Sequence, residues 1–125
     1  MQRGSVWESA EFANHYKLDN LIAIVDYNHL QSLDFCNNTL EIEMARRWEG
    51  FGWHVIEIDG HNHAQIREAL LTRATGSPTV VIANTVKGKS VSFMENNPIW
   101  HFRMPNEKEL SILMEELGLT EAELA

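Results

Sequence analysis

Residues 26–31, Asp-Tyr-Asn-His-Leu-Gln, directly follow the most apolar run of the chain and contain oxygen donors suited to a hard cation. The side-chain oxygen of Asn28 is a ligand that Mg²⁺ or Ca²⁺ accepts, and a neighbouring backbone carbonyl can be another. In open α/β sheets, ligands bind beyond the carboxyl ends of the strands, where this segment is expected. An Asp-x-Asn sequence after a strand is also typical of a turn or helix cap, so both interpretations stay open.

His101 is the second candidate, because an imidazole can donate a hydrogen bond to phosphate or move a proton near neutral pH. It lies in residues 86–105, a long segment rich in Gly, Asn and Ser. Loops of such length are often functional, although an ordinary exposed loop histidine is the alternative. The pair His61 and His63 is interpreted as a turn and helix start, because partner ligands at metal-site spacing are missing.

Composition excludes several classes of function. A formal charge of −8 over 125 residues argues against a nucleic-acid partner, which would require clustered Lys and Arg. The chain contains neither an apolar run long enough for a membrane span nor the layout of a secretion signal at its N-terminus. A single cysteine, Cys36, excludes an internal disulfide. A reducing, cytoplasmic location fits these features.

Helix-like and strand-like stretches alternate along the chain and would position the two candidates. Strands are expected at residues 21–25, 53–58 and 79–83, and helices at about 5–17, along Leu40, Met44, Trp48 and Phe51, along Ile66, Ala69, Leu70 and Ala74, and from Asn106 to Leu117. This alternation predicts an α/β fold with a parallel sheet flanked by helices. A continuous β-branched run such as residues 21–25 is typical of a strand covered on both faces.

Local signals predict where several helices begin and end. Asn106 followed by Glu109 indicates a helix start, and Gly52 and Gly118 are expected terminators. A further cap-like start occurs at Thr120 and Glu123. The first helix lacks the strand that should precede it, so we expect the sequence to begin in mid-domain.

Six different motifs, spread over nearly the whole chain, occur together in one protein family. They are residues 2–8 (Gln-Arg-Gly-Ser-Val-Trp-Glu), 17–28, 51–56 (Phe-Gly-Trp-His-Val-Ile), 59–61 (Asp-Gly-His), 85–89 (Thr-Val-Lys-Gly-Lys) and 91–97 (Val-Ser-Phe-Met-Glu-Asn-Asn). Together they resemble the thiamine-binding region of transketolases, above all the split bacterial type with its two halves in separate polypeptides. The resemblance implies that residues 1–125 are the C-terminal half of a thiamine diphosphate-binding domain, and hence a partial thiamine diphosphate-binding fold.

The resemblance also assigns roles to individual residues. In that family a Gly-Asp-Gly motif begins the cofactor site and a later Asn ends it. Asn28 matches this Asn, and Leu30 matches the residue whose carbonyl also holds the divalent metal, Mg²⁺ or Ca²⁺. His101 matches a histidine that contacts the cofactor's diphosphate and the substrate, which makes it the catalytic candidate. The Asp of the motif would fall just before Met1, so we expect little or no cofactor binding by the isolated chain.

The activity implied by the resemblance is transfer of a two-carbon ketol unit between sugar phosphates, as in the pentose phosphate pathway. Missing sequence or a partner would complete the enzyme, and the chain alone is expected to be inactive. The implied partner is a second transketolase subunit with the pyrimidine-binding and C-terminal domains, in a homo- or hetero-oligomer. One alternative is a non-catalytic remnant or assembly partner. Another is a different thiamine enzyme, such as a deoxyxylulose phosphate synthase.

Three positions bear on how the chain relates to that family. Arg3 stands where relatives usually carry Glu, in a segment that contacts the partner subunit. In that family, carboxylates of this segment link the two active sites of the dimer, and Glu8 matches a second acidic position of that network. Ser90 replaces a usual Gly in the loop that carries His101.

Overall fold

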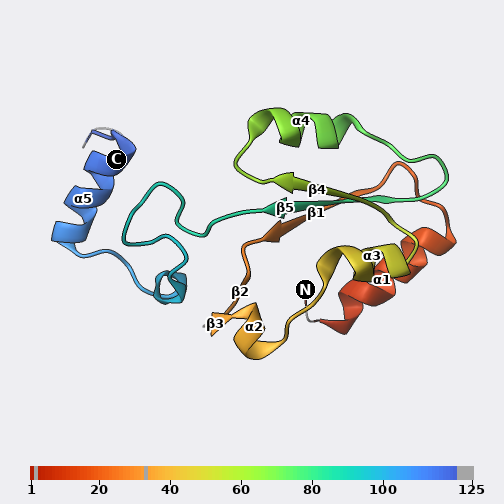
Figure 1. The fold of residues 1–125 in the computed structure, drawn as a ribbon, viewed down its shortest axis with the longest axis horizontal. Helices are drawn as coiled ribbons and strands as arrows, with labels where there is room; N and C mark the ends of the chain where they lie inside the picture. The colour runs from red at the N-terminus through yellow and green to blue at the C-terminus, as the bar shows by residue number, and fades with distance from the viewer. Residues whose placement is uncertain (2, 33, 121–125) are drawn as a thin grey trace.

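The computed structural model describes residues 1, 3–32 and 34–120. Its elements, in chain order, are α1 (Gly4–His15), β1 (Ile22–Tyr27), β2 (Leu30–Gln31), β3 (Asp34–Phe35), α2 (Cys36–Thr39), α3 (Met44–Gly50), β4 (His54–Asp59), α4 (His63–Leu71), β5 (Thr79–Asn84), the 3₁₀ helix η1 (Pro98–His101) and α5 (Glu107–Leu117) (Figure 1). Among the described helices, not one combines the length and apolar character of a transmembrane span.

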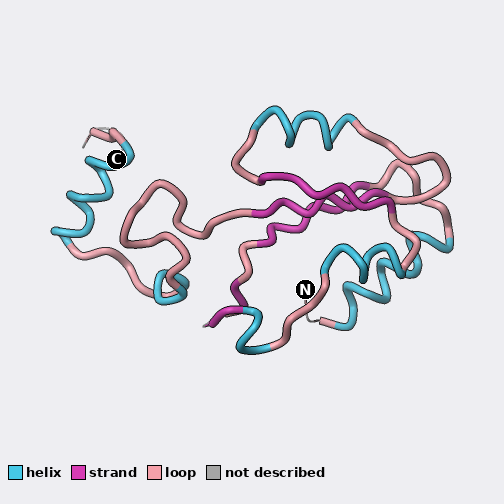
Figure 2. The backbone as a smooth tube through the Cα atoms, in the orientation of Figure 1, coloured by secondary structure: helices cyan, strands magenta, loops and turns pink. Residues whose placement is uncertain are grey.

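β1, β5 and β4 form a parallel sheet in that order, and the predicted α/β class is confirmed. The register pairs Tyr27 with Asn84 and Asn84 with Asp59, so the three strands end level with one another. Figure 2 shows α1 and α3 on one side of the sheet and α4 on the other. A second, two-stranded antiparallel sheet joins β2 to β3 and was not predicted, because each of its strands has only two residues.

The main core lies between the sheet and the layer of α1 and α3. Ala10 and Ala13 are 1% and 3% exposed, so the small residues of α1 allow it to approach the sheet closely. The indole N–H of Trp53 donates to the Ala10 carbonyl at 2.9 Å. Trp48 packs against Trp53 with ring centroids 4.6 Å apart, and both tryptophans belong to the core.

The opposite face of the sheet is only partly covered. Ile58, Ala69 and Val81 form a smaller buried cluster where α4 packs against β4 and β5. Ile24 of β1 is 62% exposed, because α4 does not extend over that strand. The prediction that β1 is covered on both faces is therefore wrong for this chain.

Most predicted helix signals are confirmed, with shifts at the ends. Asn106 and Glu109 form a capping box at the start of α5, and Gly118 ends the helix in a left-handed conformation, with φ of 64°. Leu40 lies before α3 and is 52% exposed, because that helix begins only at Met44. The start expected at Thr120 and Glu123 falls partly outside the described residues.

The segment after β5 leaves the sheet and ends in α5, away from both helix layers (Figures 1 and 2). Two polar contacts hold α5 to this segment. The Ser92 amide donates to Glu116 at 2.7 Å, and Arg103 donates to both carboxylate oxygens of Glu109 at 2.7 Å. Phe102 and Met104 are 67% and 84% exposed, so the segment presents apolar side chains to solvent.

Candidate functional site

The carboxyl ends of the three parallel strands meet at one edge of the sheet, where the arrowheads of β1, β4 and β5 lie in Figure 1. Residues 28–31 leave from β1, residues 60–62 leave from β4, and residues 85–97 leave from β5. Ligands of α/β sheets bind at this edge, because the loops that follow the strands converge there. Asn28 and Leu30 therefore lie where the sequence predicts a site.

A tight turn brings Asn28 and Leu30 together. The Leu30 amide donates to the side-chain oxygen of Asn28 at 3.0 Å. His29, between them, adopts a left-handed conformation with φ of 58°, and this bends the chain back on itself. The turn interpretation of this segment is confirmed, and the role of Asn28 and Leu30 as metal ligands stays a prediction.

The donors in this turn fit a hard divalent cation in type but supply only part of a coordination shell. An amide oxygen accepts two interactions, so Asn28 retains one lone pair beside its hydrogen bond from Leu30. Its side chain and the Leu30 carbonyl are both neutral oxygen donors, which suit Mg²⁺. Across residues 1, 3–32 and 34–120, no group of three or more His, Cys, Asp or Glu side chains could hold a metal. The rest of the shell is left to phosphate oxygens, water or other residues.

A hollow of about 250 Å³ opens beside the turn, lined by Tyr27, His29, Phe35, Cys36, Asn37 and Glu41. The Tyr27 ring lies 4.2 Å from the His29 ring, and its hydroxyl donates to the Ile42 carbonyl at 3.4 Å. Burial raises the pKa of Tyr27, and the nearby Cys36, Glu41 and Glu57 raise it further. Tyr27 therefore stays a neutral hydrogen-bond donor at the wall of this hollow.

The two residues that follow β5 form hydrogen bonds on both sides, with β1 and with the turn after β4. The Thr85 hydroxyl donates to the carboxylate of Asp26 on β1, and the Thr85 amide donates to the Tyr27 carbonyl at 3.2 Å. On the β4 side, the Val86 amide donates to Nε2 of His61 at 2.8 Å. His61 was predicted only as a turn residue. Its position directly after an Asp-Gly turn at a strand end was the one signal for this contact.

His101 lies on a different part of the molecule. It is the exposed last residue of η1, whose start is capped by Asn97 through a hydrogen bond from the Ile99 amide at 3.2 Å. The indole N–H of Trp100 donates to the Phe93 carbonyl at 2.9 Å and holds η1 to its own loop. None of the hydrogen bonds or ring contacts among the described residues joins His101 to the turn at Asn28. The structure thus places Asn28 and Leu30 directly after a strand of the sheet, and His101 on η1 in the segment after β5.

The comparison with known proteins decides the family. A family model described as transketolase, thiamine diphosphate binding domain, matches residues 1–124. The chain belongs to this transketolase family. The resemblance read from the sequence is confirmed.

Named transketolases are also the relatives of this chain. It is 42% identical over 116 residues to one subunit of the apulose-4-phosphate transketolase of Actinobacillus succinogenes, a match that covers 91% of this chain and 42% of that protein. It is 38% identical over 117 residues to human transketolase, which covers 92% of this chain and 19% of that one. The chain therefore spans less than half of either relative. Campylobacter jejuni transketolase has the same fold, with a TM-score of 0.83 over 94% of this chain and 19% of its own, at 24% identity.

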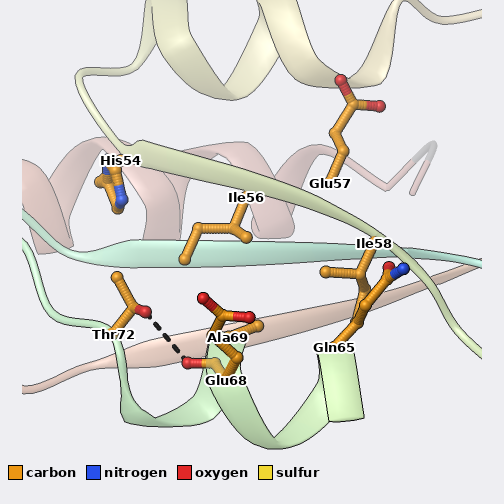
Figure 3. A pocket seen from close by; sticks show the side chains of 8 residues that line it. All are labelled: His54, Ile56, Glu57, Ile58, Gln65, Glu68, Ala69 and Thr72. Carbon is orange, nitrogen blue, oxygen red and sulfur yellow. Dashed lines mark hydrogen bonds between the residues drawn. The ribbon is translucent and has the colours of Figure 1, made fainter. Parts of the chain in front are cut away.

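A further groove of about 320 Å³ lies at the free edge of β4, beside α4 (Figure 3). Ile56 and Ile58 point toward α4, whereas Glu57 points to the other side of the strand. The Thr72 hydroxyl donates to the Glu68 carbonyl at 3.0 Å, which closes the end of α4. The groove lies along the strand rather than at the carboxyl edge, so it does not coincide with the candidate site of a transketolase domain.

Proposed function

We propose that this chain supplies the metal- and diphosphate-binding part of a transketolase, with residues 1–125 as the C-terminal half of that domain. The observation that carries the proposal is the turn in which Asn28 and Leu30 present oxygen donors at the carboxyl edge of the sheet. Membership of the family supports a metal-binding role for this turn, because the same geometry on an unrelated sheet would not by itself indicate a site.

Asn28, through its side-chain oxygen, and Leu30, through its carbonyl, would hold Mg²⁺, or Ca²⁺ in its place. Neutral oxygen donors leave the cation's charge available to the diphosphate of thiamine diphosphate. When bound, the cofactor supplies the nucleophilic carbon and the electron sink for transfer of a two-carbon ketol unit. His101 would donate a hydrogen bond to the diphosphate and contact the substrate, and is the catalytic residue of this proposal.

The substrates proposed are sugar phosphates, as in the pentose phosphate pathway of the cytoplasm. Two relatives named as subunits, for apulose 4-phosphate and for 6-deoxy-6-sulfo-D-fructose, take sugars that carry an anionic group. Both names contain the word subunit, which supports a second transketolase subunit as the partner of this chain. The partner proposed carries the pyrimidine-binding and C-terminal domains, in a homo- or hetero-oligomer. Such a partner would cover exposed apolar side chains such as Ile24, Phe102 and Met104.

A second candidate is an assembly role without catalysis. Asn28 and Leu30 are neutral donors, and no carboxylate ligand set accompanies them among the described residues. A site without a charged ligand attracts a cation weakly. This candidate predicts a folded chain that joins a partner and leaves the cofactor unbound.

Calorimetric titration with thiamine diphosphate and Mg²⁺ tests the proposal, on the chain alone and then mixed with the second subunit of the Actinobacillus succinogenes enzyme. We expect binding in the mixture and little or none by the chain alone. Asn28→Ala should weaken binding by at least roughly 10–100-fold, the range for losing a residue that only orients a metal ligand. The matched control is Asn20→Ala, which replaces an exposed Asn at the opposite end of β1.

The outcomes separate the two candidates. Equal binding by Asn28→Ala and Asn20→Ala would refute the metal role of Asn28. Association of the two subunits without heat from the cofactor would favour the assembly role.

A further inference from the structure

The β4–α4 turn contacts the segment that carries His101 through one imidazole. Nε2 of His61 accepts a hydrogen bond from the Val86 amide at 2.8 Å, and Val86 is the second residue after β5. The turn itself is fixed at its other end, because the His61 amide donates to the Asp59 carboxylate at 2.9 Å. The Gly60 amide also donates to the Asn84 carbonyl at 2.8 Å, so the turn and the end of β5 lie side by side.

The contact at Val86 is connected to His101 by a series of short contacts within the loop. The Asn96 amide donates to the Lys87 carbonyl at 3.0 Å and closes the loop directly after Val86. Gly88 packs against Met94 so closely that a Cβ there would lie 2.6 Å from the Met94 Cβ. Beyond the closure, Trp100 is bound to the Phe93 carbonyl at 2.9 Å. The direction in which the chain leaves Val86 therefore propagates to η1 and to His101 at its end.

The ring of His61 can accept this hydrogen bond only in one protonation state. A neutral imidazole with its proton on Nδ1 leaves Nε2 as an acceptor, whereas the charged ring has N–H groups on both nitrogens. Two N–H groups facing each other repel, so protonation removes the contact with Val86.

Two carboxylates interact with His61, one at the end of β4 and one in the loop after β5. Asp59 on β4 accepts from the His61 amide, and Glu95 lies in the loop after β5, where it pairs with Lys89 at 3.6 Å. The Ser90 amide holds the pKa of Glu95 below its usual range, and Lys89 and a charged His61 lower it further. Glu95 therefore stays an anion to which a protonated His61 can turn once it releases Val86.

We propose that His61 is a positioning residue for His101: its neutral ring anchors the start of the loop at Val86, and protonation releases that anchor. The inference rests on the role proposed for His101 in the transketolase reaction. In this proposal His61 acts through Val86, by setting where the loop leaves the sheet. The chain thereby gains a dependence on pH at a residue that is not one of the proposed metal ligands.

The test is amide hydrogen exchange and ¹H–¹⁵N NMR on the full chain, with the variants His61→Ala, His61→Gln and His63→Gln. At pH 7.5, His61→Ala should speed exchange of the Val86 amide roughly tenfold, as loss of one ordinary hydrogen bond implies. Gln offers a side-chain acceptor that does not titrate, so His61→Gln should restore protection. His63→Gln should match the wild type, because the His63 ring makes no hydrogen bond among the described residues.

The pH profile distinguishes positioning from a merely structural role. Between pH 8 and pH 5.5, the amide chemical shifts of Val86, Trp100 and His101 in the wild type should change together with the ring signals of His61. His61→Gln should remove these shared changes, and His63→Gln should keep them. If His61→Ala does not fold, the wild-type titration and His61→Gln still decide the matter.

Unchanged Val86 exchange in a folded His61→Ala would overturn the inference, as would loop signals that ignore the His61 titration. Failure of the proposed function has a different signature. If His101→Ala leaves thiamine diphosphate binding by the assembled subunits unchanged, the role of His101 is wrong. The coupling of His61 to Val86 would then persist as a measured contact that positions no catalytic residue.

Discussion

The sheet unit, residues 4–84, and the C-terminal segment, residues 86–117, are held together by different forces. In the sheet unit, Val80 and Ile82 are 0% exposed and the tryptophans of the α3 layer pack on them. In the C-terminal segment, α5 contains no buried residue, and Val91 at 4% is the one buried apolar side chain described. Burial stabilises the first region, whereas hydrogen bonds and ion pairs hold the second.

This difference affects the candidate site, because one half of the site lies on the sheet unit and the other half on the C-terminal segment. Asn28 and Leu30 follow a strand of the packed sheet, so their geometry is set within the chain. His101 lies on a segment whose apolar side chains Phe102 and Met104 are exposed, at 67% and 84%. In the proposed assembly, the partner that covers those side chains would also set the position of His101 relative to the turn.

The largest expected effect is loss of the sheet unit through Trp53→Ala. Trp53 is 6% exposed, and its indole N–H bonds to the Ala10 carbonyl. Removing a buried aromatic ring should lower the free energy of unfolding by about 3–5 kcal/mol. Urea denaturation followed by circular dichroism measures the change.

The control for Trp53→Ala is Phe102→Ala, which removes an aromatic ring that is 67% exposed. It should change the free energy of unfolding by less than about 0.5 kcal/mol. Equal losses from both variants would contradict the division into a packed unit and a lightly held segment.

A smaller, local effect should follow acidification of the C-terminal segment. The Asn106 amide and the Arg103 guanidinium hold the pKa of Glu109 below its usual range. A pKa lowered in the folded state stabilises α5 at neutral pH, and that stabilisation is lost as the pH falls through the lowered value. NMR chemical shifts of α5 should therefore move toward coil values as the pH falls below the usual carboxyl range.

Glu109→Gln should remove this acid transition, and the matched variant Glu107→Gln should keep it. Glu107 lies in the same first turn but makes no side-chain hydrogen bond among the described residues. An acid transition of α5 that persists in Glu109→Gln would show that other carboxylates hold the segment.

The smallest effect concerns backbone strain in the loop before His101. Ser90 has φ of 72°, a left-handed conformation that glycine adopts more easily than serine. Ser90→Gly should therefore stabilise the loop by roughly 0.5–1 kcal/mol. Hydrogen exchange of residues 88–97 measures this gain.

Ser92→Gly is the opposing control, because Ser92 is not among the residues with positive φ. Glycine there adds freedom to the unfolded chain and should cost about 0.5–1 kcal/mol. The same sign for both variants would mean that the φ of Ser90 does not govern loop stability.

The sequence predicted the parallel sheet because its signals are local. The apolar runs of β1, β4 and β5 and the capping box at Asn106 and Glu109 need only neighbouring residues to act. The same locality explains the error at Ile24. An apolar run indicates that a strand can be buried on both faces, but burial itself depends on elements elsewhere, and α4 leaves β1 uncovered.

The candidate site was predicted unevenly for the same reason. The Asn28 turn follows from an Asp-x-Asn sequence at a strand end, so its place at the carboxyl edge could be read from the chain. The contact of His61 with Val86 joins residues that are distant in sequence and depends on the order of β4 and β5 in the sheet. The distance between His101 and the turn was beyond prediction, because no local pattern specifies it.

The most direct test of the proposed metal site is paramagnetic relaxation by Mn²⁺ in place of Mg²⁺, with thiamine diphosphate and the assembled subunits. Mn²⁺ broadens the NMR signals of nearby nuclei, so it reports which amides surround the metal. We predict that the amides of residues 28–31 broaden first, that the His101 amide follows, and that Asn28→Ala suppresses both effects. Broadening centred on Glu57 and Glu68, which line the groove beside α4, with residues 28–31 unaffected, would contradict the assignment.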